Sequence, residues 1–152
     1  MVVDTRLARL LHVLLHMHLH GGSTTSETIS QMLRTNPVVV RRTMAAMRDA
    51  GYVTSTGGRG GGWSLSANLD ELTVADVYKA LAPSNPFTLG PAVDNPNCPV
   101  EAAVNRHVTA ALAKAESALL HHFGKTRLTD LTSDAVDSPL ILGRGSLARV
   151  RR

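Results

Sequence analysis

The sequence predicts a mainly α fold with a small β-hairpin wing, in which a winged helix-turn-helix precedes a long dimerisation helix. Two short amphipathic segments joined by a tight turn predict the helix-turn-helix. Two short strands around a glycine-rich stretch predict the wing. Farther along, apolar residues recur every three or four positions over about six turns, which is typical of a helix that packs on a partner helix.

The composition limits the classes of protein open to this chain. Its 152 residues are 43% hydrophobic, enough for one modest core. No stretch approaches the roughly 18 apolar residues of a membrane span. Three histidines interrupt the apolar segment Leu10–Leu19 and no cleavage site follows it, so we expect neither a membrane anchor nor a signal peptide. The single cysteine excludes an internal disulfide and indicates a reducing compartment, so we expect a cytoplasmic protein.

Charge is distributed unevenly along the chain. Residues 1–66 carry seven arginines against three acidic residues, and residues 67–138 carry five basic residues against nine acidic ones. Residues 139–152 carry four arginines and no acid. The basic first part favours contact with a polyanion, although such an asymmetry also arises by chance in small proteins.

The first predicted helix is amphipathic and ends at Gly21-Gly22. Its apolar residues have the spacing of a buried helical face; they are Leu7, Leu10, Leu11, Leu14 and Leu15. The histidines at 12, 16 and 20 follow another face at i, i+4 and i+8. His12 and His16 have the spacing to share a metal ion, but no acidic residue or cysteine is near them in the sequence. An ordinary polar or interface surface is the alternative that we favour, and we expect no metal site.

Two capping signals define the predicted helix-turn-helix. Thr24 and Glu27 have the spacing of a capping box and open a helix of two to three turns. Asn36-Pro37 then supplies an N-cap followed by proline at the first helical position. The second helix turns apolar residues inward and ends at a glycine C-cap; these residues are Val40, Met44, Met47, Ala50 and Gly51.

The stretch T-S-T-G-G-R-G-G-G-W lies between predicted strands at 52–55 and 63–65. It lacks the lysine and the following helix of a phosphate-binding loop, and no parallel βαβ unit surrounds it. A hairpin tip that meets a DNA minor groove fits better, since glycines let the backbone approach and Arg59 can enter the groove. A solvated flexible tip is the alternative. Trp63 is expected to pack the base of the wing onto the core.

The chain divides into four predicted segments. Residues 1–82 form the winged helix-turn-helix and end with a helix over 70–81, and 83–98 form a loop rich in proline. Residues 99–138 hold a long helix over 99–122 and a short one over 127–136, followed by a basic tail, 139–152. The long helix carries an apolar seam that we assign to a dimer interface, or alternatively to contacts within one subunit; its main members are Val100, Val104, Val108, Leu112 and Leu119.

The candidate DNA contacts cluster around the helix-turn-helix and the wing. Val38 or Val39 is suited to a thymine methyl group, and Arg41 to bidentate pairing with guanine, whereas Arg42 is placed for a phosphate. Hydroxyls at the preceding helix start suit a phosphate oxygen or simple capping. A solvated role is the alternative for the arginines. The whole set comprises Thr24, Thr25, Ser26, Asn36, Val38, Val39, Arg41, Arg42, Arg59 and Gly60.

The stretch N-P-V-V-V-R-R-T-M-A-A-M-R-D-A-G-Y-V-T-S-T-G-G-R-G-G-G-W-S-L resembles the BadM/Rrf2 family of bacterial transcriptional regulators. The resemblance extends over about residues 4–135, and V-R-R, A-G-Y-V and G-G-G-W carry it. It implies a winged-helix homodimer that binds a palindromic operator, and we expect a repressor. The wing departs from the family pattern, because Gly57 stands where an arginine is usual and Arg59 replaces a proline.

The resemblance also bears on cofactors. Iron–sulfur members of the family carry three cysteines near the start of the dimerisation helix, whereas this chain has Cys98 alone, so we expect no cluster. Cys98 lies at a helix start, where the helix dipole stabilises a thiolate, and is a candidate redox sensor or a buried structural residue.

Other functions compete with this interpretation. No nucleophile motif or carboxylate pair indicates an enzyme. A regulator that responds to a metal or a small ligand through its histidines is one alternative, and a winged-helix protein interaction module without DNA is another. We expect double-stranded DNA and a second copy of the chain as partners.

Overall fold

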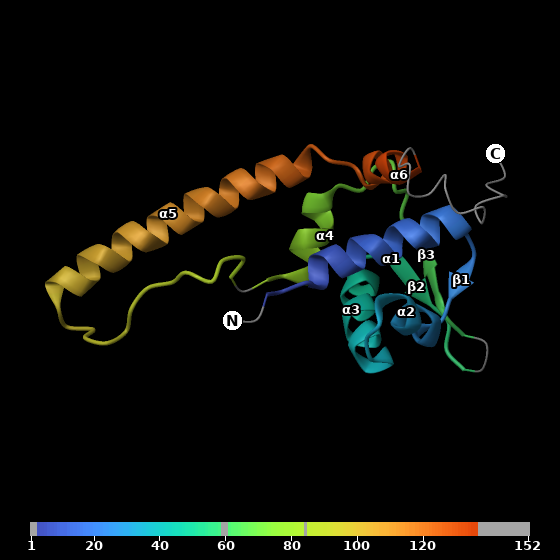
Figure 1. Cartoon of the computed structure of the whole chain (residues 1–152), viewed down its shortest axis with the longest axis horizontal. Helices are drawn as coiled ribbons and strands as arrows, with labels where there is room; N and C mark the ends of the chain where they lie inside the picture. Colours follow the sequence, from blue (N-terminus) through green and yellow to red (C-terminus); the bar gives the residue numbers. More distant parts are fainter. Residues whose placement is uncertain (1–2, 59–60, 84, 137–152) are drawn as a thin grey trace.

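The computed structural model describes residues 3–58, 61–83 and 85–136, and it has the predicted fold class, mainly helical with a small sheet. Arg59, Gly60 and the basic tail lie outside the described residues. Figure 1 shows a body of short helices around the sheet and one long helix that leaves it. Along the chain the elements are α1 (Arg6–His20), β1 (Ser23–Thr24), α2 (Ser26–Leu33), α3 (Pro37–Asp49), β2 (Val53–Ser55), β3 (Trp63–Leu65), α4 (Val74–Leu81), α5 (Pro99–Gly124) and α6 (Leu128–Val136).

The sheet is antiparallel, with its strands in the order β1-β3-β2. Strands β2 and β3 form the predicted hairpin. Strand β1, which pairs Thr24 with Trp63, was not predicted, because two residues show no alternation of polar and apolar side chains. The backbones approach closely here: a Cβ atom on Gly62 would lie 2.7 Å from the carbonyl oxygen of Thr24. Glycine at this position therefore allows β1 to join the wing.

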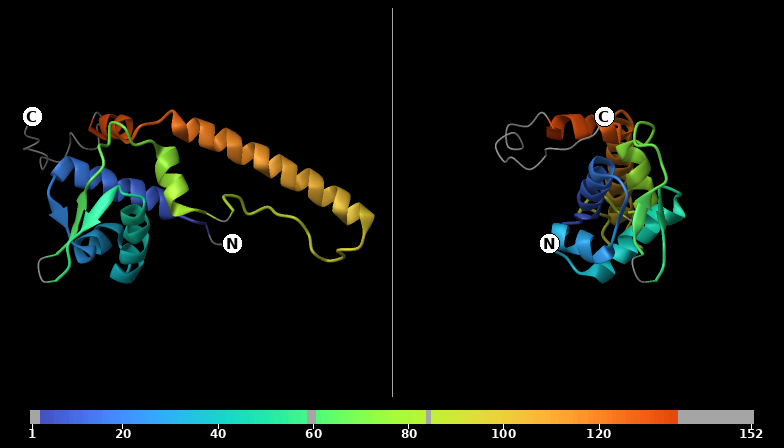
Figure 2. Two further views of the ribbon diagram at one scale, coloured as in Figure 1. Left: turned by 180° about the vertical axis from the view of Figure 1, so that it is seen from behind. Right: turned by 90° about the vertical axis from the view of Figure 1, so that its right-hand side faces the viewer.

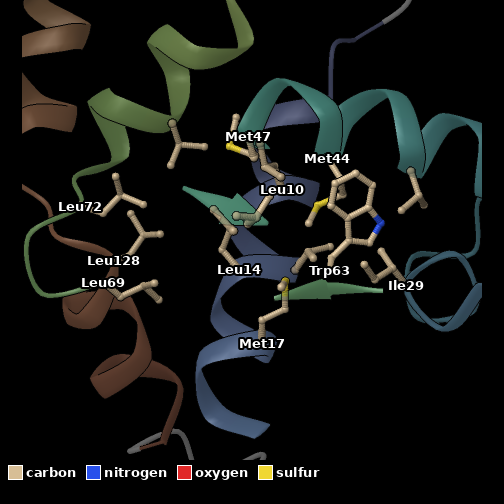
Figure 3. Packing of buried hydrophobic residues seen from close by; sticks show 14 of the residues in the cluster. Leu10, Leu14, Met17, Ile29, Met44, Met47, Trp63, Leu69, Leu72 and Leu128 are labelled. Atoms are coloured by element: carbon tan, nitrogen blue, oxygen red, sulfur yellow. The ribbon is translucent and has the colours of Figure 1, made fainter. Parts of the chain in front are cut away.

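The core lies between α1, α3 and the sheet, as Figure 3 shows. Leu14 of α1 and Met47 of α3 are completely buried, and Ile29 of α2 is 1% exposed. Trp63 closes the core at the base of the wing, as expected, and is 7% exposed. Burying one large apolar side chain contributes roughly 1.5–3 kcal/mol, so this cluster holds the helix-turn-helix and the wing in fixed positions.

Helix α2 starts one residue later than its capping signal suggested. Its N-cap is Thr25, whose hydroxyl oxygen accepts a hydrogen bond from the amide of Thr28 at 3.1 Å. The prediction that Thr24 pairs with Glu27 in a capping box was wrong, because Thr24 is used in β1. Two adjacent threonines offer the same hydroxyl, and only the sheet decides between them.

The helix predicted over 70–81 is shorter, since α4 begins at Val74. Thr73 and Asp76 form a reciprocal capping box, in which each side chain accepts from the other residue's amide, and this pair fixes the start. Helix α6, grouped with the dimerisation segment in the sequence, lies along α1 instead. Its Leu128 is fully buried in the core. We refer to α1–α4, the sheet and α6 as the body.

Helix α5 projects from the body, as the left view of Figure 2 also shows from behind. Its C-terminal end is fixed on α4, where the hydroxyl of Tyr78 donates to Glu116 at 3.1 Å and the rings of Tyr78 and Phe123 lie 5.8 Å apart. The preceding loop runs outward beside α5, and Asn105 makes two hydrogen bonds with the backbone of Ala92. We call α5 and the loop before it the arm. None of the described helices is long and apolar enough to cross a membrane.

Candidate nucleic-acid interface

The turn between α2 and α3 fixes where α3 begins. Arg34 ends α2 in the left-handed conformation, with φ of 51°. The side-chain oxygen of Asn36 accepts a hydrogen bond from the amide of Val38 at 2.8 Å, and Pro37 takes the first helical position. Asn36, a candidate DNA contact, therefore uses this oxygen to cap α3. The helix begins where the sequence predicted.

Helix α3 has a buried face and an exposed face. Val40, Met44 and Met47 are buried in the core as predicted; Ala50, expected with them, is exposed because it is the C-cap. Val38 and Val39 remain 55% and 43% exposed. Arg41 and Arg42 are exposed as well. The first two turns of α3 thus present two apolar and two cationic side chains to solvent.

Glu27 of α2 holds one of these arginines. The Nη2 atom of Arg41 lies 2.7 Å from Oε1 of Glu27, and both side chains are more than half exposed. An ion pair this exposed contributes about 0–1 kcal/mol. Its structural effect is to orient the Arg41 guanidinium toward the start of α2. A ligand that binds Arg41 has to compete with this carboxylate.

The three hydroxyl residues at the start of α2, Thr24, Thr25 and Ser26, have different surroundings. Ser26 is 7% exposed, and its Oγ accepts a hydrogen bond from the indole Nε1 of Trp63 at 2.9 Å. This contact joins α2 to the base of the wing, so burial works against the predicted phosphate contact of Ser26. Thr24 and Thr25 are partly exposed beside the first free amides of α2. The hydroxyl of Thr25 already accepts from the amide of Thr28 and lies 3.0 Å from the hydroxyl of Thr28, so the phosphate contact of these two threonines stays a prediction.

A hollow of about 400 Å³ separates the start of α2, the outer side of α3 and the wing. Arg41 and Arg48 line it from α3, and Thr56, Gly58 and Gly62 line it from the hairpin. Arg48 was not a candidate, although its spacing of seven residues from Arg41 puts both on one side of α3. Its guanidinium also lies 3.4 Å from the carboxylate of Asp49.

The first turns of the predicted seam on the arm are left exposed by the described part of the chain. Val100 is 71% exposed and Val104 is 54% exposed. Val108, Leu112 and Leu119 are half-buried, and no residue of α5 is buried. An interface within one subunit would have buried the first turns of the seam, so among the described residues this alternative is wrong for Val100 and Val104.

Cys98 lies at the N-terminal end of α5, and Figure 1 shows that this end of the helix is the one far from the body. It is the N-cap residue of α5, makes no side-chain capping hydrogen bond and is partly exposed. The fully buried structural role considered from the sequence therefore does not apply to this conformation.

The histidine face of α1 forms a ladder of rings. The ring centroids of His12 and His16 lie 4.8 Å apart, and those of His16 and His20 lie 5.5 Å apart. Burial lowers the pKa of His16, and the neighbouring rings of His12 and His20 lower it further. Within the described residues, no three His, Cys, Asp or Glu side chains are grouped to hold a metal ion.

Sequence comparison with known proteins relates the chain to regulators of transcription. The model of the family described as "Rrf2: Iron-dependent Transcriptional regulator" matches residues 3–134. YwnA of Bacillus subtilis (strain 168), named as an HTH-type transcriptional regulator, is 27% identical over 130 residues, which are 86% of this chain and 96% of YwnA. The protein rrf2 of Nitratidesulfovibrio vulgaris is 29% identical over 138 residues, 89% of each chain.

Structural comparison confirms the fold. The crystal structure of a protein from Lactobacillus plantarum superposes with a TM-score of 0.74 over 91% of this chain and 95% of that one, at 22% identity. At this identity the likeness shows the fold alone, a winged helix with a long projecting helix.

Proposed function

Because the chain belongs to the Rrf2 family of transcriptional regulators, we propose that it binds double-stranded DNA as a homodimer. As a member of this family it is a regulator and not an enzyme. The observation that carries the proposal is the first two turns of α3. They have a capped, fixed start and turn Val38, Val39 and Arg41 outward beside the wing. This is the arrangement of a helix that enters the major groove.

Base recognition rests on α3. The fork of Arg41 matches the O6 and N7 acceptors of guanine, and Val38 and Val39 offer methyl groups to thymine. Glu27 has to release Arg41 as the helix docks. Such a contact discriminates between bases by about 1–3 kcal/mol.

Backbone contacts position the subunit on the duplex. Arg42 and Arg48 suit phosphates on either side of the groove, and Thr24 and Thr25 suit a phosphate at the start of α2. In this proposal the wing approaches the minor groove, and Arg59 and Gly60 are the residues that we expect to contact it. Each phosphate contact adds to the salt dependence of binding.

The seam of α5 is the surface that we propose for contact with the second subunit. It exposes Val100 and Val104 at the tip of the arm, and a symmetric copy covers them with the same residues. Two recognition helices about one DNA turn apart, roughly 34–36 Å, then read a palindromic operator.

We extend the proposal to regulation at the operator. If the operator overlaps a promoter, the bound dimer blocks transcription and is therefore a repressor. We propose that it acts in the cytoplasm. Cys98 lies at the tip of the same helix that carries the seam. In the proposal, its oxidation changes how the two arms pack and weakens DNA binding.

Iron has no part in this mechanism. The description of the family names iron, but a cluster needs several thiolate or imidazole ligands. The sequence has one cysteine, and the described residues contain no group of three donors. These residues do not fit a cluster, and the absence of a cofactor stays a prediction.

The test is binding of the purified protein to labelled fragments of the promoter region upstream of its own gene, at two salt concentrations, with and without a thiol oxidant. We expect specific binding that weakens steeply with salt. Oxidant should release wild-type protein from DNA and leave Cys98→Ser bound. Binding that oxidant does not change would remove Cys98 from the proposal and keep the regulator.

A matched pair of variants tests the assignment of α3. Arg41→Ala should weaken operator binding about 5-fold to 150-fold, in line with the loss of one bidentate base contact. Arg106→Ala removes the same charge from the arm, on the side of α5 opposite the seam. Equal effects of the two variants would mean that only net charge matters. No specific binding at any salt concentration would favour a protein interaction module instead.

A further inference from the structure

A second hollow, of about 410 Å³, lies between the last turns of α1, the β1 segment and α2. Its volume falls within the roughly 300–1,000 Å³ of small-molecule sites. Met17 and Ile29 are buried beneath it, and half-buried Met32 completes an apolar floor. The DNA contacts proposed above leave most of this hollow unused.

The rim of the hollow is polar and carries donors. His16 and His20 line it from α1, with their rings nearly parallel at 12°, and Thr28, whose hydroxyl lies 3.0 Å from that of Thr25, lines it from α2. An imidazole N–H donates a hydrogen bond whether or not the ring is charged. No carboxylate is among the described residues that line the hollow. The rim is therefore complementary to an anionic oxygen.

We propose that this hollow binds a small organic carboxylate with an apolar body, such as an aromatic acid. The carboxylate accepts hydrogen bonds from His16 and His20, and the body packs on Met17, Ile29 and Met32. A metal ion fits less well, because two imidazoles without a third donor hold it weakly, and no group of three donors exists within the described residues.

The position of the hollow makes the ligand an effector. Helix α2 forms one wall of it and also carries, at its start, Thr25 of the proposed DNA interface. A body wedged between α1 and α2 shifts α2 against α3 and changes affinity for the operator. This last step rests on the proposed function, whereas binding of the carboxylate does not.

Calorimetric titration of the full chain with 2-naphthoate tests the binding. We expect saturable binding, and binding at least about tenfold weaker for the neutral isostere 2-naphthamide, because hydrogen bonds to a charged group are lost. His16→Leu and His20→Leu should each weaken naphthoate binding by about tenfold or more. His18→Leu is the matched control, since exposed His18 belongs to the same helix and does not line the hollow.

A variant that fills the hollow gives an independent readout. Met32→Trp should abolish naphthoate binding while both imidazoles remain, with folding checked by circular dichroism. Absence of naphthoate binding by the wild type would overturn the proposal, as would equal losses in His16→Leu and His18→Leu. Binding of Ni²⁺ without binding of naphthoate would overturn it in favour of a metal chelate.

Operator affinity with and without 2-naphthoate tests the effector step. A change that His20→Leu removes supports it, and naphthoate binding that leaves operator affinity unchanged overturns it. A wild-type protein that binds naphthoate but no operator under any condition would contradict the proposed function and leave the binding site in place.

Discussion

Helix α1 has 15 residues and buries four of its apolar side chains within the chain, whereas helix α5 has 26 residues and buries none. Both have the apolar spacing of a packed helix. The body covers α1 with α3, α4 and α6, whereas α5 is fixed to α4 through its C-terminal end and its other end projects from the body (Figure 1). Apolar periodicity thus predicts that a helix has a partner and does not tell which chain supplies it.

The difference separates two kinds of stability. Leu10 and Leu14 are removed from water by folding of one subunit. Val100 and Val104 are removed from water only when something else covers the arm, and each Å² of covered apolar surface contributes about 25 cal/mol. We therefore expect substitutions in the body to change the free energy of unfolding, and substitutions in the seam to change association.

The largest effect is expected from Val104→Asp. In a symmetric dimer the new carboxylate would be buried twice without a partner, and each uncompensated buried charge costs about 3–5 kcal/mol. The variant should therefore be monomeric in sedimentation velocity and should lose cooperative operator binding.

Ala113→Asp is the control for that variant. Ala113 is exposed and, nine residues later at 100° per residue, lies on the opposite side of α5. The Ala113→Asp variant should stay dimeric. If both variants dissociate, α5 is sensitive to charge as a whole, and if neither does, the seam is not the interface.

In the body, Leu14→Ala should lower the free energy of unfolding by about 2–5 kcal/mol, because it leaves a cavity at a completely buried site. Leu112→Ala in the half-buried seam should change the unfolding of a dilute monomer by far less. Urea unfolding monitored by circular dichroism measures both. Equal losses at low protein concentration would contradict the distinction between body and arm.

Ser26→Ala tests the predicted phosphate contact of Ser26 against the contact that its hydroxyl makes with the wing. The substitution leaves the buried indole N–H of Trp63 without its acceptor at 2.9 Å, which costs about 1–3 kcal/mol of folding stability. Because the hydroxyl is buried against the wing, we expect the salt slope of DNA binding to stay unchanged. Ser23→Ala, an exposed neighbour in β1, should leave stability nearly unchanged. A reduced salt slope in Ser26→Ala would support the predicted phosphate contact of Ser26.

Local signals in the sequence were sufficient for much of the fold. Asn36-Pro37 fixed the start of α3, and the glycines at 21 and 22 fixed the end of α1, because capping depends on neighbouring residues alone. The long helix was recognised from its own repeat. The seam residues Val100 and Val104 were exposed as a dimer interface requires, but dimerisation itself stays a prediction.

The remaining features depend on contacts between distant residues. Strand β1 exists because Thr24 meets Trp63, and that pairing moved the cap of α2 to Thr25. The burial of Ser26 follows from the same wing contact across 37 positions. No local pattern contains these pairs. The pairing of Glu27 with Arg41 was missed for the same reason. The sequence had drawn attention to Glu27 only as a capping residue.

The smallest expected effect comes from that pair. Glu27→Gln removes a carboxylate from the proposed DNA surface and frees Arg41, so operator binding should tighten by about two- to fivefold, and stability should change by less than about 1 kcal/mol because both side chains are exposed. Asp94→Asn removes the same charge from an exposed position in the arm and should leave DNA affinity unchanged. Fluorescence anisotropy at low salt resolves this difference. Weaker operator binding by Glu27→Gln would show that the carboxylate positions Arg41 for its base instead of competing with it. An equal gain from Asp94→Asn would show that DNA senses the net charge of the subunit, and the division between a DNA-binding body and an associating arm would then lose its electrostatic support.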